Sequence, residues 1–280
     1  MKKSLLIIGI ALLYSSCEKY DEDYQQYLDR LKEYSSYNNE ETCNYSFSYM
    51  DQDDANLQHI KQKYDLETIA GNGDELSRIT NLMFWVNENL EHDGTAEKPY
   101  PPNAENIIET CVRENRGVNC RMLATILNEF YLAMGFRSRF VTCMPYEHNF
   151  TDCHVVTIVH SNQLNKWIMM DPSFAGYFQD ENDVYMDLAE VREKLINGES
   201  LLISDFLNHN GDTYTKQEYK TYITKNLFRF NCPENSEYNY EALNFNERQY
   251  IELIPLNYEP EESNCIYTRN SANFWTIPQK

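Results

Sequence analysis

Hydrophobic and polar positions divide the chain into a helical part followed by a strand-rich part. Between residues 66 and 134, apolar side chains recur every three or four positions, which is the spacing of amphipathic helices. Short runs rich in Val, Ile and Trp come next, as is typical of β-strands. Helices followed by an antiparallel sheet predict an α+β fold.

Capping residues and turns mark where the expected elements begin and end. Asp74 and Asn103 are typical N-caps and predict helices over residues 75–90 and 104–113. Further helical patterns cover residues 24–34, 66–70, 187–197 and 215–228. Strand-like runs occupy residues 154–160, 166–170, 250–256, 265–269 and 274–277.

One predicted helix begins with a cysteine. Residues 116–119, Arg-Gly-Val-Asn, favour a turn, and Cys120 then opens an apolar-periodic segment that stops at Gly135. A thiol at the positive end of a helix is more easily ionised, and the thiolate is the reactive form. Cys120 is therefore a candidate nucleophile.

A histidine and an aspartate stand at the ends of the two strand-like runs that follow. His154 begins the first run, and Asp171 comes directly after the second. An antiparallel hairpin would bring these two side chains together. Cys120, His154 and Asp171, in this order, form a candidate catalytic triad.

The segment around these three residues resembles the transglutaminase-like superfamily, whose members share a papain-type fold and a Cys, His, Asp triad in this order. The motifs that carry the resemblance are Gly-Val-Asn-Cys at 117–120, Gly-Phe-Arg-Ser-Arg at 135–139, Cys-His-Val-Val at 153–156 and Trp through Asp-Pro at 167–172. The chain has one extra residue between Gly117 and Cys120, and it has Val155 and Val156 where many relatives have Ala-Trp. The resemblance implies an α+β core in which the nucleophile helix packs on an antiparallel sheet.

The resemblance also implies amide chemistry through a thioester. Cys120 would attack a peptide or side-chain amide, with His154 as acid and base and Asp171 orienting the imidazole. The Cys120 backbone N–H would stabilise the oxyanion, and Trp85 is a candidate second donor, with core packing as its alternative role. Hydrolysis is favoured over cross-linking because no feature of the sequence excludes water. The alternative is a non-catalytic surface module that binds peptides or glycans on the same fold.

The first 17 residues are typical of a targeting segment. Lys2 and Lys3 precede an apolar run over residues 5–13 that is too short to span a bilayer. The small residues before Cys17 resemble a bacterial lipobox, in which this cysteine carries lipid such as palmitate. The acidic residues that follow resemble the surface signal of Bacteroides lipoproteins. We therefore expect a lipid-anchored protein of the cell envelope, at the outer membrane or surface of a Gram-negative bacterium.

The expected organisation has four parts. Residues 1–17 are the signal peptide, and residues 18–60 are a tether and N-terminal extension. Residues 61–180 form the transglutaminase-like core, and residues 181–280 add helices and strands packed on it.

Charge and composition restrict the partners. The formal net charge of -20 makes nucleic acid an improbable partner, because phosphate binding requires basic surfaces. Peptide or protein substrates fit the chemistry, and the 22 tyrosines also suit glycan contacts. Arg137 and Arg139 alternate on a strand and suggest salt bridges on its outer face.

The remaining cysteines and acidic residues bear on disulfide formation and on metal binding. Up to three disulfides are possible, including a bridge between Cys143 and Cys153, and free thiols are the alternative. No metal or other cofactor is expected. Two groups contain metal-ligand residue types, but their spacing fits neither a zinc nor an EF-hand pattern: Cys143, His148, Cys153 and His154, and Asp180, Glu181, Asn182, Asp183 and Asp187.

Overall fold

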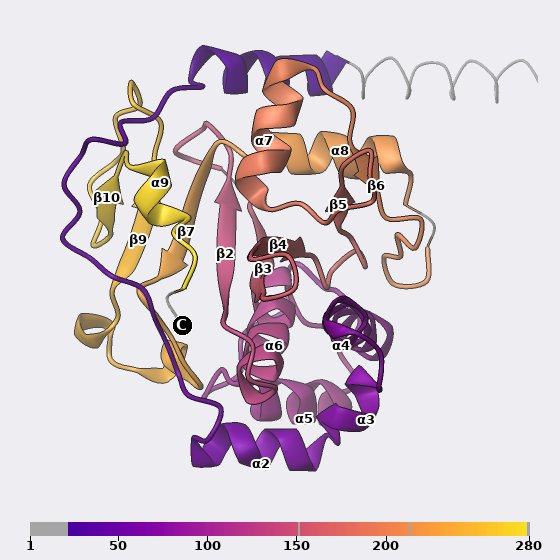
Figure 1. The fold of residues 1–280 in the computed structure, drawn as a ribbon. Coiled ribbons are helices and arrows are strands. Elements are labelled where there is room, and N and C mark those ends of the chain that lie inside the picture. Colours follow the sequence, from indigo (N-terminus) through magenta and orange to yellow (C-terminus); the bar gives the residue numbers. More distant parts are fainter. Residues whose placement is uncertain (1–21, 151, 213, 279–280) are drawn as a thin grey trace, which may run out of the picture.

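A six-stranded sheet runs through the centre of the protein (Figure 1). The computed structural model describes residues 22–150, 152–212 and 214–278. The strand order is β10-β9-β7-β2-β3-β4, and only the β10–β9 pair is parallel. The strands are β2 (Ser138–Met144), β3 (His154–Ser161), β4 (Lys166–Met170), β7 (Arg229–Pro233), β9 (Tyr250–Leu253) and β10 (Ile266–Thr268).

Five helices from the first half of the chain pack on one face of this sheet (Figure 1). They are α2 (Ala55–Lys63), α3 (Leu66–Ala70), α4 (Glu75–Asn89), α5 (Ala104–Glu114) and α6 (Cys120–Ala133). Helix α6 lies at their centre, and every side chain of residues 122–133 is buried. This helix contacts both β2 and β3 as well as α2, α4 and α5. The α+β prediction and the packing of the nucleophile helix on an antiparallel sheet are confirmed.

The other face of the sheet carries a second apolar core. Successive side chains of β4 alternate between the two cores, since Ile168 faces the helices and Trp167 faces the opposite side. The second core is covered by α7 (Leu188–Asn197), α8 (Lys216–Lys225), the helical residues 22–33 and the short α9 (Ser271–Phe274). Smaller elements complete this half: β1 (Ser48–Tyr49) with β8 (Asn235–Ser236), β5 (Phe178–Gln179) with β6 (Leu202–Ile203), and the 3-10 turns η1 (Tyr240–Ala242) and η2 (Phe245–Glu247).

The predicted N-caps of two helices are confirmed. The Asp74 side chain accepts from the Ser77 N–H at 2.9 Å, and Asn103 accepts from Asn106 N–H at 2.9 Å. These bonds satisfy backbone donors that have no partner within the helix.

Two sequence expectations in the flanking elements are wrong. Helix α8 ends at Lys225, and the chain then enters β7, an unpredicted strand that pairs with both β2 and β9. Phe274, expected to begin a strand over 274–277, is instead the last residue of α9, whose N-cap Asn270 accepts from the Asn273 N–H at 2.8 Å. Helix α2, capped by Asp54, runs across residue 60, where the sequence suggested the boundary between the N-terminal extension and the core.

Arg139 also differs from its prediction. Its side chain is fully buried, with the guanidinium carbon 3.7 Å from the Phe47 ring centroid. It donates to the Phe274 carbonyl at 2.6 Å. Strand β2 is central and covered on this face, so an exposed salt bridge has no room to form there.

The predictions for residues 1–17, including lipidation of Cys17, lie outside the described residues. Within the part of the chain that is described, no helix is both long enough and apolar enough to cross a membrane. The seven cysteines described are all free thiols, so the bridge considered between Cys143 and Cys153 is not formed.

Candidate active site

The nucleophile turn is held at the start of α6 by close backbone packing. Cys120 is the first residue of the helix and is partly exposed. The Asn119 side chain caps the helix by accepting from the Met122 N–H at 3.1 Å. A Cβ atom on Gly117 would lie 2.7 Å from the Asp93 Cβ atom and 3.0 Å from the Glu91 carbonyl oxygen. Glycine is therefore needed for residues 91–93 to pack against the turn.

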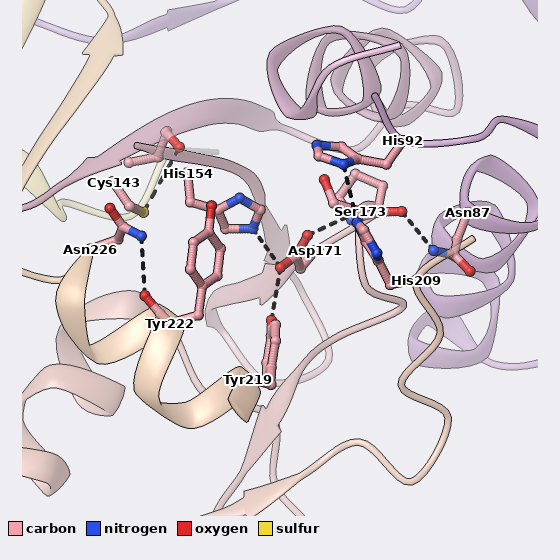
Figure 2. Close-up of polar contacts among 12 residues, drawn as sticks. Asn87, His92, Cys143, His154, Asp171, Ser173, His209, Tyr219, Tyr222 and Asn226 are labelled. Carbon is pink, nitrogen blue, oxygen red and sulfur yellow. Dashed lines mark hydrogen bonds and ion pairs between the residues drawn. The ribbon is translucent and has the colours of Figure 1, made fainter. Parts of the chain in front are cut away.

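The β3–β4 hairpin brings the histidine and the aspartate together (Figure 2). The His154 Nε2 atom lies 2.6 Å from the Asp171 Oδ2 atom. The side chains are 1% and 0% exposed. Because Nε2 is paired with Asp171, the hydrogen bond between His154 and Cys120 uses Nδ1. The structure thus brings together the three residues that the sequence suggested.

Two further hydrogen bonds fix the Asp171 carboxylate. The Tyr219 hydroxyl donates to Oδ2 at 2.9 Å, and the Ser173 N–H donates to Oδ1 at 2.9 Å (Figure 2). Gly176 makes room for Tyr219, since a Cβ atom there would lie 2.3 Å from the Tyr219 oxygen. The sequence showed Tyr219 only as part of the apolar stripe of a helix, so its role at the site was missed.

Aromatic rings enclose the His154 imidazole. The ring centroids of Tyr222 and Phe174 lie 5.1 Å and 5.6 Å from that of His154, both in edge-on orientations. The Tyr222 hydroxyl donates to Asp152 at 3.1 Å. These contacts limit rotation of the imidazole.

Burial and hydrogen bonding act on Cys120 in opposite directions. Burial raises the pKa of the thiol, but hydrogen bonds from His154, His92 and the Val155 N–H, with the positive charge of His154, lower the pKa to about 6. Burial lowers the pKa of His154, whereas the charge and hydrogen bond of Asp171 outweigh this and raise the pKa to about 10. Between these values the pair is a thiolate and an imidazolium, the reactive state of a paired cysteine.

A second histidine at the nucleophile was not predicted. His92 follows α4 and forms its own side-chain hydrogen bond with Cys120. Its Nδ1 atom lies 3.1 Å from the Nε2 atom of His209, which comes from a loop more than one hundred residues later (Figure 2). The sequence offers no periodicity or spacing that relates His92 to His209.

Trp85 does not lie at the site, so its assignment as an oxyanion donor is wrong. Trp85 belongs to α4, and its ring packs against those of Phe130 and Tyr64 with centroid distances of 5.6 Å and 6.2 Å. Phe130 is two to three turns along α6 from Cys120, or about 15 Å at 1.5 Å per residue. The helical core therefore holds the indole, as the alternative assignment proposed.

The two groups weighed as metal sites have other roles. His148 pairs with the Tyr258 hydroxyl at 3.0 Å, and His154 is engaged by Asp171. Asp180 accepts from two backbone N–H groups of its own turn, and Asp187 caps α7. Over the described ranges, no three His, Cys, Asp or Glu side chains are arranged to hold a metal ion.

Comparison with known proteins yields a family match and a distant structural likeness. Residues 62–172 match the transglutaminase-like superfamily. A crystal structure of a candidate cysteine protease from Cytophaga hutchinsonii is 18% identical, with a TM-score of 0.33. The alignment covers 41% of this chain and 37% of that one. No curated protein matches the chain.

The matched segment contains the nucleophile helix, the hairpin and all three residues of the candidate triad. Residues 62–172 are therefore the part of the chain that matches the transglutaminase-like superfamily.

Proposed function

We propose that the protein is a cysteine-dependent enzyme that cleaves or transfers peptide or side-chain amides through a thioester on Cys120. The observation that carries the proposal is the placement of His154 between Cys120 and Asp171, with a 2.6 Å contact to the aspartate. A buried imidazole held by a buried carboxylate is the arrangement that activates a thiol for acyl transfer.

The proposed reaction begins with the thiolate. The Cys120 sulfur attacks the amide carbonyl, a C–S bond forms, and the carbonyl π electrons move to oxygen. When the tetrahedral intermediate collapses, the C–N bond breaks and His154 gives its proton to the leaving nitrogen. His154 then accepts a proton from water, or from an amine, as that nucleophile attacks the thioester and releases Cys120.

Hydrolysis is favoured over transfer to an amine. Cys120 is partly exposed at the start of α6, so water has access to a thioester formed there. An acyltransferase needs the amine to compete with water at about 55 M, which requires a site that excludes water or binds the amine.

The test uses a peptide library together with a biotin-labelled primary amine, with products identified by mass spectrometry. We expect cleaved or deamidated products in excess over amine-linked ones, and Cys120→Ala removes both. Peptide binding that is equal in wild type and Cys120→Ala, with no product, contradicts the proposal and favours the binding module.

An envelope location is the second part of the proposal. It is supported by the basic start, the apolar run and Cys17 in the first 17 residues. Mass spectrometry of the mature protein from cells should find lipid on an N-terminal Cys17. An unmodified terminus at another residue contradicts the lipid anchor but leaves the catalytic proposal intact.

A further inference from the structure

His92 reaches the nucleophile from a different part of the fold than His154. Its imidazole hydrogen-bonds to Cys120, and its Nδ1 atom is engaged by the Nε2 atom of His209 at 3.1 Å. Nε2 is therefore the nitrogen that faces the sulfur. The proposed reaction so far assigns no role to this imidazole.

The backbone of His92 is clamped on two sides. Its N–H donates to the Asn210 Oδ1 atom at 2.6 Å, and the Asn210 side-chain N–H donates back to the His92 carbonyl at 2.8 Å. On the other side His92 forms a β-bridge with Val118, two residues before the nucleophile. This places the ring beside the N-terminus of α6 in a fixed position, as a preorganised donor requires.

His209 is itself held in place. Its ring stacks on Phe174 with a centroid distance of 4.8 Å and an interplanar angle of 19°, and Phe174 also packs against His154. Burial, together with the neighbouring His92, lowers the pKa of His209, so its ring stays neutral near pH 7. A neutral His209 that carries its proton on Nε2 donates to His92 and leaves the His92 proton on Nε2, facing Cys120.

We propose that His92 is a second catalytic imidazole, which donates a hydrogen bond to the oxyanion formed on Cys120, with His209 and Asn210 as its positioning residues. The inference rests on the proposed function and deepens it. The oxyanion is bonded to the carbon that the sulfur attacks, so a donor that contacts the sulfur lies beside the new negative charge. The Cys120 backbone N–H, in the first turn of α6, is the other donor.

The two histidines have different roles because their hydrogen-bond partners differ. His154 is paired with Asp171 and keeps the proton that the leaving nitrogen needs. His92 faces the imidazole of His209 and is suited to donate a hydrogen bond without transferring its proton. No bond to His92 forms or breaks, and the electron pair that moves onto the oxygen returns when the leaving group departs.

Two probes separate this role from simple activation of the thiol. Alkylation of Cys120 by iodoacetamide forms no oxyanion, whereas acylation by p-nitrophenyl acetate does. For each probe the rate constant is measured against pH up to its plateau, where Cys120 is fully ionised. Comparing plateaus removes any effect of a substitution on the pKa of the thiol.

We expect His92→Ala to lower the acylation plateau about 10²–10³-fold, as for loss of one oxyanion donor, and to change the alkylation plateau by less than about threefold. His92→Gln keeps an N–H donor and should recover about tenfold or more of that loss. His209→Phe keeps a ring on Phe174 but removes the hydrogen bond, so it should lower acylation selectively and by less than His92→Ala. His59→Ala, on the exposed side of α2, is the control and should leave both plateaus unchanged.

Each remaining outcome overturns the inference. Equal losses in the acylation and alkylation plateaus mean that His92 affects only the reactivity of the thiol or the local fold. If His92→Ala lowers neither plateau, His92 has no role in the reaction. The proposed function fails together with the inference if wild-type Cys120 is alkylated with the pH profile of an ordinary thiol and is not acylated by p-nitrophenyl acetate. The alkylation plateau, measured on the same samples, shows that the variant site is folded.

Discussion

The Asp171 carboxylate is surrounded by hydrogen-bond donors. Its two oxygens accept from the His154 imidazole, the Tyr219 hydroxyl and the Ser173 N–H, all within 2.9 Å. Removal of one of these donors would leave a buried carboxylate oxygen with fewer hydrogen bonds, which costs free energy. The hydroxyl of Tyr219 is therefore expected to contribute both to stability and to the alignment of His154.

Tyr219→Phe tests this contribution. The substitution keeps the ring and removes one hydrogen bond to a charged group, which should lower the free energy of unfolding by about 1.5–3 kcal/mol. Urea unfolding at pH 7 measures the change. Tyr267→Phe is the control, because its exposed hydroxyl bonds Ser263 at 2.7 Å and should contribute less than about 1 kcal/mol. Equal losses in the two variants contradict a special role for Tyr219.

At the scale of elements, the nucleophile turn depends on contact with the segment that follows α4. Gly117→Ala places a methyl group 2.7 Å from the Asp93 Cβ atom and 3.0 Å from a backbone oxygen, so the two segments must separate. We expect a loss of about 1–3 kcal/mol in the free energy of unfolding, as for other overpacked sites. We also expect a higher pKa for Cys120, because His92 moves away with the segment.

Thermal or urea unfolding and the pH profile of Cys120 alkylation measure these two effects. Gly94→Ala is the matched control, since the nearest atom to its new methyl group lies 3.8 Å away. A stability of Gly117→Ala equal to that of Gly94→Ala contradicts the close-packing argument.

Helix α6 also carries a buried carboxylate that joins three elements. Glu129 is 1% exposed and accepts from the Ala104 N–H at 2.7 Å, which starts α5, and from the Asn239 N–H at 2.8 Å, beside η1. Burial raises the pKa of Glu129 from 4.5 to about 8. The folded state therefore holds a proton that the unfolded state has released between these two pH values.

This linkage predicts a loss of stability as pH rises. The contribution of protonated Glu129 is complete below about pH 4.5 and is lost as pH rises toward 8. Glu129→Gln keeps an acceptor and does not titrate. The free energy of unfolding of wild type, relative to that of Glu129→Gln, should therefore fall by at least about 1 kcal/mol between pH 5 and pH 8, at 1.36 kcal/mol per pKa unit. Urea unfolding of both proteins at the two pH values tests this. A difference between them that does not change with pH contradicts the protonated state of Glu129.

At the scale of the whole molecule, sequence patterns located the triad because each member has a local signature. Cys120 follows a turn and a cap, and His154 and Asp171 flank strands joined by a short hairpin. His92, His209 and Tyr219 have no such signature, because packing between distant segments alone brings them to the site. Strand β7 was missed for a related reason: its central place depends on pairing with β2 and β9, on either side of it in the sheet.

In the proposed mechanism, His154 and Asp171 hold Cys120 as a thiolate near neutral pH. The direct measurement is the rate of Cys120 alkylation by iodoacetamide against pH, read on the Cys120 peptide by mass spectrometry. Cys265, whose pKa is raised mainly by burial, serves as the internal control thiol. We predict that the alkylation rate of Cys120 has its pH midpoint near pH 6 in wild type. In His154→Ala the midpoint should lie at about pH 8.5 or above, the range of an unassisted thiol. A wild-type midpoint near about 8.5 that His154→Ala leaves unchanged would contradict this mechanism.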